Sequence, residues 1–423
     1  MRGKLLTNDL IHNSSDYNAA GSPSVRWLDG SSYTALEQPH QSSDAASSGQ
    51  RSSEEGTPGG TGGGGTVVAT GRAKEIVKYD AVDGRRSVLV SLADLTPEGA
   101  SNPLEIHDYS WSGDGTKLLI FTESQKVWRQ NTRGDYYVVD VSGSGAPIVQ
   151  LGRSDFDEHC LMFAKFSPKG APRVGFVYHN NIYVQTLATM DVVQLTHDGL
   201  PGHGGMAPII NGNFDWVYEE ELSIRDGWRW SPDGQRVAYW QLQTSDVQWF
   251  SLVNNTADPP YAKVTEYPYP KVGTKNPVAT IGVVSANGGG ETRWLDVAPL
   301  DGSEHYIARM EWAPASSPNG QNGGALLVQR IPREQKVIEM LLVDCSETAI
   351  MAVGDADTTS MPTPGGVTIL IEERDAAWVD VRDDGFHLFA DGSFTWYSER
   401  SGYRHLYLGA FPDNRSCAHR TCR

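Results

Sequence analysis

A unit made of an aromatic residue, a tight turn and a β-rich run recurs along the chain, and this repeat constrains the fold more than any other feature. The clearest copies start at Trp111, Phe166 and Trp230, and more divergent copies start at Trp312 and near Val379. In the third copy the turn reads Ser-Pro-Asp-Gly, whose residues supply the dihedral angles of a tight turn. The run after each turn is rich in β-branched and aromatic residues, so each copy predicts a β-hairpin.

The spacing of the copies predicts how the hairpins are arranged. The aromatic residues are roughly 55 to 80 residues apart, which is longer than a minimal four-stranded blade but fits blades that carry insertions. Many short strands without helical periodicity favour radial blades over a sandwich. With 423 residues, 39% of them hydrophobic, the chain suits such a repeat and is too long for one ordinary compact domain. We therefore predict an all-β fold, a β-propeller of four-stranded blades.

Composition divides the chain into four parts. Residues 41–72 are rich in Ser and Gly and hold almost no apolar side chains, which predicts a disordered insertion. Their glycine tract lacks the Lys-Ser/Thr ending of a phosphate-binding loop, so we expect no nucleotide site there. Residues 1–40 are assigned to an N-terminal segment with the first propeller strands, 73–408 to the propeller, and 409–423 to an aberrant tail without β patterning.

Charge and cysteine content exclude several classes of function. The formal net charge is −17 and no basic stripe interrupts it, so nucleic acid is not expected as a partner. The chain shows no signal peptide and no apolar run of membrane-spanning length, so we expect a soluble protein of unassigned compartment. The cysteines lack the CxxC spacing of zinc sites, and we expect no metal and no cofactor. They are Cys160, Cys345, Cys417 and Cys422.

Residues 215–222 place three consecutive carboxylates, Glu219, Glu220 and Glu221, among bulky apolar residues. Repulsion and desolvation would both raise the pKa values of such a cluster, so a cation is its natural partner if it faces a cavity. A solvated acidic helix end is the alternative. Neighbouring residues on a strand point to opposite faces, so two adjacent glutamates can share one ligand only from a helical turn or a bulge. We predict a short helix inserted into a blade.

The order of several motifs resembles the propeller domain of the dipeptidyl peptidase IV family, within the prolyl oligopeptidase class of serine peptidases. The resemblance extends over about residues 27–408 except the Ser/Gly-rich insertion. The segments that carry it are residues 127–129 before 135–137, residues 215–222 followed by 228–234, residues 267–273 with Asn276-Pro277, and residues 398–406.

The resemblance implies a substrate site. In the family a double-glutamate motif binds the free amino terminus of a peptide, and this role falls on Glu220 and Glu221. Arg129 then contacts the backbone carbonyl region of the substrate; an ordinary surface salt bridge is the alternative for this arginine. Glu219 is assigned to structure, paired with Arg225 or Arg229. A peptide α-ammonium is largely charged at neutral pH and forms strong charge-assisted hydrogen bonds with carboxylates.

The family further implies an activity and partners. Its members release amino-terminal dipeptides, typically with proline or alanine second, bind peptides with a free amino terminus, and are often dimeric. The propeller caps an α/β-hydrolase domain that carries the serine nucleophile. A noncatalytic propeller that binds peptides or protein partners is the alternative function for this chain.

The chain departs from the family in its chemistry. No Gly-x-Ser-x-Gly elbow occurs, and the eleven histidines, for instance His179 and His197, are scattered and expected to be structural or exposed. We assign no catalytic residue. We expect a truncated propeller portion with about five or six of the family's eight blades, whose unpaired edges would favour instability or aggregation.

Overall fold

A computed structural model describes residues 25–39, 73–143, 148–170, 172–201, 207–256, 261–299, 301–314, 324–345, 366–381, 386–389 and 393–410. The whole of the predicted insertion at 41–72 lies outside these residues, as does the predicted tail at 409–423 except for its first two residues. The chain divides into two compact units, and the first consists of Met1–Ile106, Gly115–Lys117 and Val139–Ile148. Each unit is described by itself. In the described part, no helix is both long enough and apolar enough to cross a membrane.

The first unit contains one antiparallel sheet in the order β1-β2-β3-β4. Its strands are β1 (Val25–Trp27), β2 (Ser32–Glu37), β3 (Glu75–Asp80) and β4 (Arg86–Val90). The side chains of Ala35, Ile76, Val77 and Val90 are almost fully buried and form the core of this sheet.

The second unit begins with two four-stranded meanders that share one sheet, in the order β12-β11-β10-β9-β7-β6-β5 with β8 beside β7. The meanders join where Arg133 and Gly134 pair with Met162 and Leu161. The first comprises β5 (Asp108–Trp111), β6 (Lys117–Lys126), β7 (Asn131–Asp140) and β8 (Val149–Gln150), with a few residues of β6 and β7 in the first unit. The second comprises β9 (Leu161–Phe166), β10 (Arg173–Tyr178), β11 (Asn181–Thr186) and β12 (Val192–Gln194).

The next sheet carries the predicted helix. It is five-stranded, in the order β13-β15-β18-β19 with β14 beside β15. Its strands are β13 (Ile209–Asn211), β14 (Trp228–Trp230), β15 (Arg236–Gln243), β18 (Val278–Ser285) and β19 (Arg293–Leu295). Helix α2 (Trp216–Glu221) lies between β13 and β14 in the chain, and the separate hairpin of β16 (Trp249–Asn254) and β17 (Lys263–Pro268) lies between β15 and β18.

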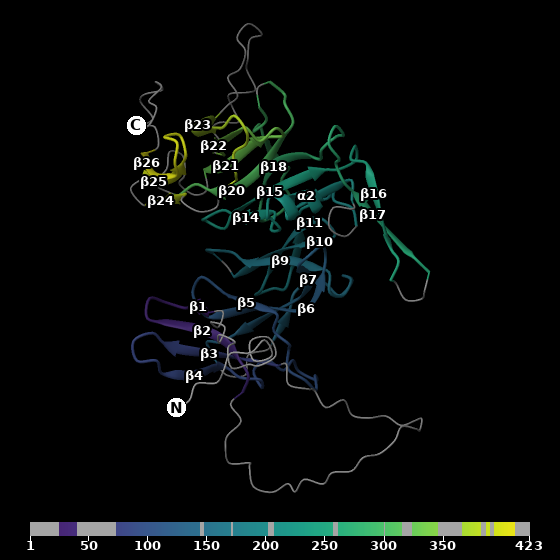
Figure 1. Ribbon diagram of the computed structural model, residues 1–423. Coiled ribbons are helices and arrows are strands. Elements are labelled where there is room, and N and C mark those ends of the chain that lie inside the picture. The colour runs from purple at the N-terminus through teal and green to yellow at the C-terminus, as the bar shows by residue number, and fades with distance from the viewer. Residues whose placement is uncertain are drawn as a thin grey trace, which may run out of the picture. The chain divides into compact units, whose positions relative to one another are not determined.

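Two further sheets complete the described chain. One is a meander of β20 (His305–Trp312), β21 (Ala325–Pro332), β22 (Val337–Asp344) and β23 (Val367–Arg374). The other has β24 (His387–Leu388), β25 (Ser393–Ser398) and β26 (His405–Ala410). Each sheet takes its strands from one continuous stretch of the chain, so each covers a narrow range of colour in Figure 1. The described residues thus form six blade-like antiparallel units, in agreement with the five or six blades expected from the motifs.

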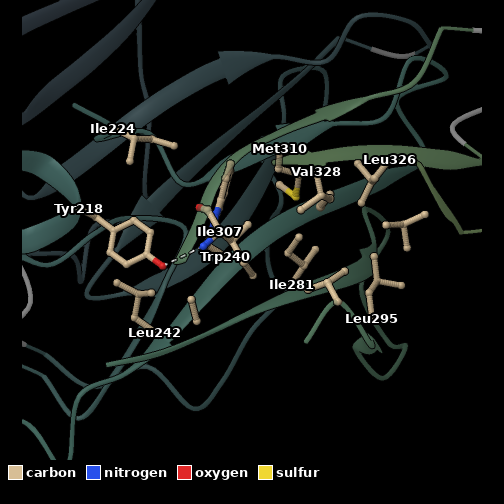
Figure 2. Packing of buried hydrophobic residues seen from close by; sticks show 14 of the residues in the cluster. Tyr218, Ile224, Trp240, Leu242, Ile281, Leu295, Ile307, Met310, Leu326 and Val328 are labelled. Carbon is tan, nitrogen blue, oxygen red and sulfur yellow. Dashed lines mark hydrogen bonds between the residues drawn. The ribbon is translucent and has the colours of Figure 1, made fainter. Parts of the chain in front are cut away.

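The cores of the second unit lie between consecutive blades. Phe121 and Tyr136 pack with Phe176 of the following blade, and Trp240 packs with Ile307 of the blade after its own. Figure 2 shows this last core, in which Ile281 and Leu295 lie opposite Leu326 and Val328. Further cores join β10 and β11 to β14 and β15, and β21 and β22 to β25.

Burial on both faces explains the continuous apolar runs that follow the turns. All six residues of β10 are buried, as are Ala325–Ile331 of β21, so neither strand needs a polar solvent face. Face-to-face packing of successive four-stranded meanders is the arrangement of propeller blades. The predicted fold class, all-β with propeller blades and one short helix, is therefore confirmed, and Phe166, Trp230 and Trp312 end strands β9, β14 and β20 as expected.

The turn of the third copy gives a test of this packing. Gly234 has φ +70°, and a Cβ added there would lie 2.7 Å from the Lys169 carbonyl oxygen of the preceding blade. Gly115 occupies the same place in the first copy with φ +68°, but its nearest neighbour is a flexible Leu28 methyl group at 3.8 Å. Gly115→Ala should cost about 1 kcal/mol of unfolding free energy from backbone strain alone. Gly234→Ala should cost about 2 kcal/mol or more, because strain and overpacking add.

Urea unfolding followed by tryptophan fluorescence measures both variants. An equal loss of unfolding free energy in the two variants would contradict the close approach of the Gly234 turn to the neighbouring blade.

Candidate functional site

Helix α2 begins at a buried aspartate. Asp215 is the N-cap residue, and its Oδ1 accepts a hydrogen bond from the Tyr218 amide at 3.0 Å. This contact satisfies a backbone donor that a helix leaves unpaired at its first turn. Asp215 is 2% exposed, and burial raises the pKa of its carboxyl group to about 6. The predicted short helix is therefore present, with Leu222 as its C-cap residue.

Strand β20 anchors this helix at a register shift between Ile307 and Arg309. The Ile307 amide donates a hydrogen bond to the Tyr218 hydroxyl at 3.2 Å, and the Ile307 carbonyl oxygen accepts one from Trp240 Nε1 at 2.9 Å. Figure 2 shows Tyr218 pointing at the Ile307 backbone. Arg309 Nη1 donates to the Leu222 carbonyl oxygen at 2.9 Å, so the same strand also binds the C-terminal end of the helix.

The three glutamates of the helix lie in different surroundings. Glu219 is 7% exposed, with Oε1 3.6 Å from Arg225 Nε, and burial raises the pKa of its carboxyl group. Its expected structural role is thus met by Arg225, whereas Arg229 pairs with Glu311. The Glu220 side chain is 24% exposed, and Glu221 is exposed.

Arg129 lies in the loop between β6 and β7, and its Nε is 2.6 Å from Glu220 Oε2. The structure therefore brings together two of the three predicted site residues, from segments far apart in the sequence. The Arg129 side chain is 71% exposed, and ion pairs this exposed contribute about 0 to 1 kcal/mol to stability. The pair therefore orients its members more than it stabilises the fold.

An aromatic cluster holds the Arg129 loop and the helix in place. The Trp128 ring packs edge-on against Tyr267 at 5.5 Å, and Trp216 of the helix contacts Tyr269 at 5.0 Å and Tyr267 at 6.3 Å. Phe250 packs against both tyrosines. Hairpin β16–β17 and the residues after it thus support both sides of the ion pair.

A charged cluster beside the helix was not found from the sequence. Lys165 Nζ lies 2.5 and 2.6 Å from the two carboxylate oxygens of Asp226 and donates to the Trp228 carbonyl oxygen at 2.6 Å. Arg229 bonds the Asp226 carbonyl oxygen and pairs with Glu311 at 2.6 Å. The contacts connect β9, β14 and β20, which belong to three blades, and no short motif encodes partners 61 and 82 residues apart.

Comparison with known proteins identifies relatives of the chain. A family model described as the dipeptidyl peptidase IV N-terminal region matches residues 112–419. The chain is 30% identical over 249 residues to a protein named "Probable dipeptidyl-aminopeptidase B" from Phaeosphaeria nodorum, covering 56% of this chain and 25% of the relative. It is 25% identical over 339 residues to human prolyl endopeptidase FAP, covering 78% of this chain and 40% of the relative.

The fold has a close structural match. The crystal structure of Porphyromonas gingivalis dipeptidyl peptidase 4 superposes with a TM-score of 0.71 at 23% identity, covering 99% of this chain and 49% of that chain. The chain therefore spans about half the length of that structure and less than half of these two curated relatives.

Removing the Tyr218 hydroxyl tests the anchoring of the helix. Tyr218→Phe leaves the buried Ile307 amide without its acceptor, which should lower the unfolding free energy by about 1–3 kcal/mol. Tyr403→Phe is the matched control, because Tyr403 is 79% exposed and water replaces its hydroxyl. Urea unfolding measures both. A Tyr218→Phe protein as stable as the control would show that the helix does not depend on this bond.

The buried N-cap carboxyl predicts a pH dependence. The pKa of Asp215 is raised from 3.8 to about 6, so its contribution to stability is present below pH 3.8 and is lost as pH rises through 6. Asp215→Asn keeps the capping oxygen but cannot ionise. The unfolding free energy of the wild type should therefore fall relative to this variant between pH 4 and 6, by up to about 3 kcal/mol. Parallel curves of stability against pH would contradict the burial of a titrating carboxyl group.

Proposed function

The chain belongs to the dipeptidyl peptidase IV family, whose N-terminal region it matches, and on this basis we propose that it binds peptides by their free amino terminus. Glu220 and Glu221 receive the α-ammonium group, and Arg129 contacts a backbone carbonyl of the peptide. The observation that carries the proposal is the Arg129–Glu220 ion pair at 2.6 Å, beside an exposed Glu221 at the end of an anchored helix.

The chemistry of the three side chains fits this ligand. An α-amino group has a pKa near 8, so it is mostly protonated at neutral pH, and its hydrogen bonds to carboxylates are charge-assisted. The positive charge of Arg129 beside Glu220 reduces the repulsion between the adjacent carboxylates of Glu220 and Glu221. A guanidinium group has five N–H donors, so Arg129 retains donors for a peptide carbonyl while one binds Glu220.

The anchoring contacts explain how the site is preorganised. Tyr218 and Leu222 bind strand β20 from either end of the glutamate segment, and Trp216 packs on the aromatic cluster. A side chain held before binding loses less conformational entropy when the ligand arrives. Binding energy would then depend on the ammonium group itself. Capture of this group places the following residues of the peptide at fixed distances from the site.

Hydrolysis is a separate part of the proposal. The sequence contains no Gly-x-Ser-x-Gly elbow, so we propose that this chain supplies peptide binding, and that release of dipeptides requires residues outside it. Assembly into dimers also remains a proposal. Hairpin β16–β17 exposes Trp249, Leu252, Val253 and Val264 and offers an apolar surface for it.

Titration with a short peptide, carrying either a free or an acetylated amino terminus, tests amine capture. The free amine should bind more tightly, and Glu220→Gln or Glu221→Gln should each weaken its binding by roughly 10- to 100-fold, the value of a charge-assisted hydrogen bond. Isothermal titration calorimetry gives the affinities. Glu334→Gln is the control, because the Glu334 side chain is 82% exposed and pairs only loosely with Lys336, at 4.0 Å.

Two outcomes would refute the proposed site. One is equal affinity for the acetylated and free peptides, and the other is unchanged affinity in both glutamate variants. A dipeptide nitroanilide tests the chemistry separately, because turnover by the pure chain would overturn the assignment of binding without hydrolysis.

A further inference from the structure

A cluster of metal-ligating side chains lies in the second meander of the second unit and includes no residue of helix α2. It consists of Asp157, Cys160 and His179, whose ligand atoms all lie within 4.8 Å of one another. His179 Nε2 is already 3.0 Å from Asp157 Oδ2. The sequence shows no metal motif here, because the histidine is nineteen residues from the cysteine and belongs to a different strand connection.

Strand register explains why the cysteine and the histidine meet. Tyr178 at the end of β10 pairs with Leu161 at the start of β9. Antiparallel pairing continued by one residue places Cys160 opposite His179, just beyond the end of the ladder. Their proximity is thus fixed by the sheet and not by two mobile loops.

A tight turn holds His179 in place. His179 and Asn180 form the two-residue connection between β10 and β11, with φ values of 47° and 61°. Positive φ at both residues is typical of two-residue hairpin turns, and Asn, Asp and His adopt it more often than other non-glycine residues. The turn therefore fixes the backbone of His179 directly beyond the end of β10.

Aromatic stacking supports two of the three ligands. The His179 ring stacks on Tyr178 with centroids 4.0 Å apart, and Tyr178 stacks on Phe156, also at 4.0 Å. The Tyr178 hydroxyl accepts a hydrogen bond from the Asp157 amide at 3.1 Å. The same tyrosine therefore orients the histidine ring and the backbone of the aspartate, as supporting residues do around metal ligands.

The surroundings of the cluster are polar and accessible. Cys160 is half-buried, His179 is 28% exposed and Asp157 is 66% exposed, so an ion can enter from solvent. Arg133 and Asp135 also act electrostatically on the Cys160 thiol, and Asp135 bonds the neighbouring His159 through its amide and its Nδ1. Asp135 thus adds a second carboxylate near the cluster, and Arg133 adds a positive charge that offsets part of its negative potential.

We propose that Asp157, Cys160 and His179 bind a divalent transition-metal ion, with Zn²⁺ the best fit, through three protein ligands and a fourth position open to water. Imidazole nitrogen, thiolate sulfur and carboxylate oxygen are the ligands that Zn²⁺ takes. Tetrahedral ligands at about 2.0–2.3 Å from zinc lie roughly 3.3–3.8 Å apart, so small side-chain rotations close the cluster around the ion. The thiol loses its proton on binding, and the thiolate and carboxylate together neutralise the ion.

Metal titration of the full chain tests the site. Cys417 and Cys422 are changed to Ser in the background, which leaves Cys160 and Cys345 as the thiols. Co²⁺ should then give a thiolate-to-metal charge-transfer band in the near ultraviolet, and Zn²⁺ measured against a chromophoric chelator should bind once per chain. Excess Zn²⁺ should also raise the thermal midpoint, because it binds the folded state.

Three variants assign the ligands. Cys160→Ala should abolish the Co²⁺ band, and Cys160→Ala, His179→Asn and Asp157→Asn should each weaken Zn²⁺ binding by at least about 10-fold. The His179→Asn variant should fold normally, because asparagine tolerates the positive φ of this turn, so a loss of Zn²⁺ binding reports on the missing imidazole. Cys345→Ala is the matched control: Cys345 is buried, burial raises the pKa of its thiol to about 12, and its loss should leave the band intact.

The proposal is overturned if the background protein gives no Co²⁺ band. It is equally overturned if Cys160→Ala and His179→Asn bind Zn²⁺ as tightly as the background protein. The amine site is unaffected by either result, because peptide titration reports on Glu220 and Glu221 independently.

Discussion

The backbone of Ile307 is the point on which the placement of helix α2 depends. Ile307 is fully buried at a register shift, where a peptide group without partners would cost as much as a lost hydrogen bond. Tyr218 accepts from its amide and Trp240 donates to its carbonyl oxygen, so the backbone of one residue connects the helix, β15 and β20. The position of the glutamates is therefore a consequence of how two blades pack, and not of the helix's own stability, since six residues are too few for an isolated helix.

Several features of the fold could be predicted from local sequence, because they depend on neighbouring residues. The turn at Ser231–Gly234 and the apolar runs of β10 and β15 identify strands without reference to the rest of the chain. The helix was predicted because adjacent carboxylates cannot share a strand face. By contrast, only family resemblance placed Arg129 and Glu220 in one site, and it did not predict the ion pair between them; nothing in the sequence around Lys165 indicates that Asp226 would lie beside it.

Contacts between residues that strand pairing or blade packing brings together could not be predicted from the sequence. Cys160 and His179 show why: each is unremarkable in its own segment, and they become neighbours only through the Tyr178–Leu161 register. A shift of that register by one residue would turn every side chain of the strand to the other face. Resemblance to a family does not predict such contacts either, because it assigns roles only to residues within the matched motifs.

The sharing of each core by two successive blades has a consequence for folding. Most strands pair with a strand close to them in the chain, so most contacts within a blade close short loops, although β2 and β3 pair across the Ser/Gly-rich insertion and β15 and β18 across the β16–β17 hairpin. In the second unit each blade is then stabilised by the blades with which it shares a core, and this unit behaves as a linear array with nearest-neighbour coupling. A substitution that weakens one inter-blade core should destabilise mainly the two blades that share it. Unfolding should begin at the blade with the fewest buried contacts and not involve all blades at once.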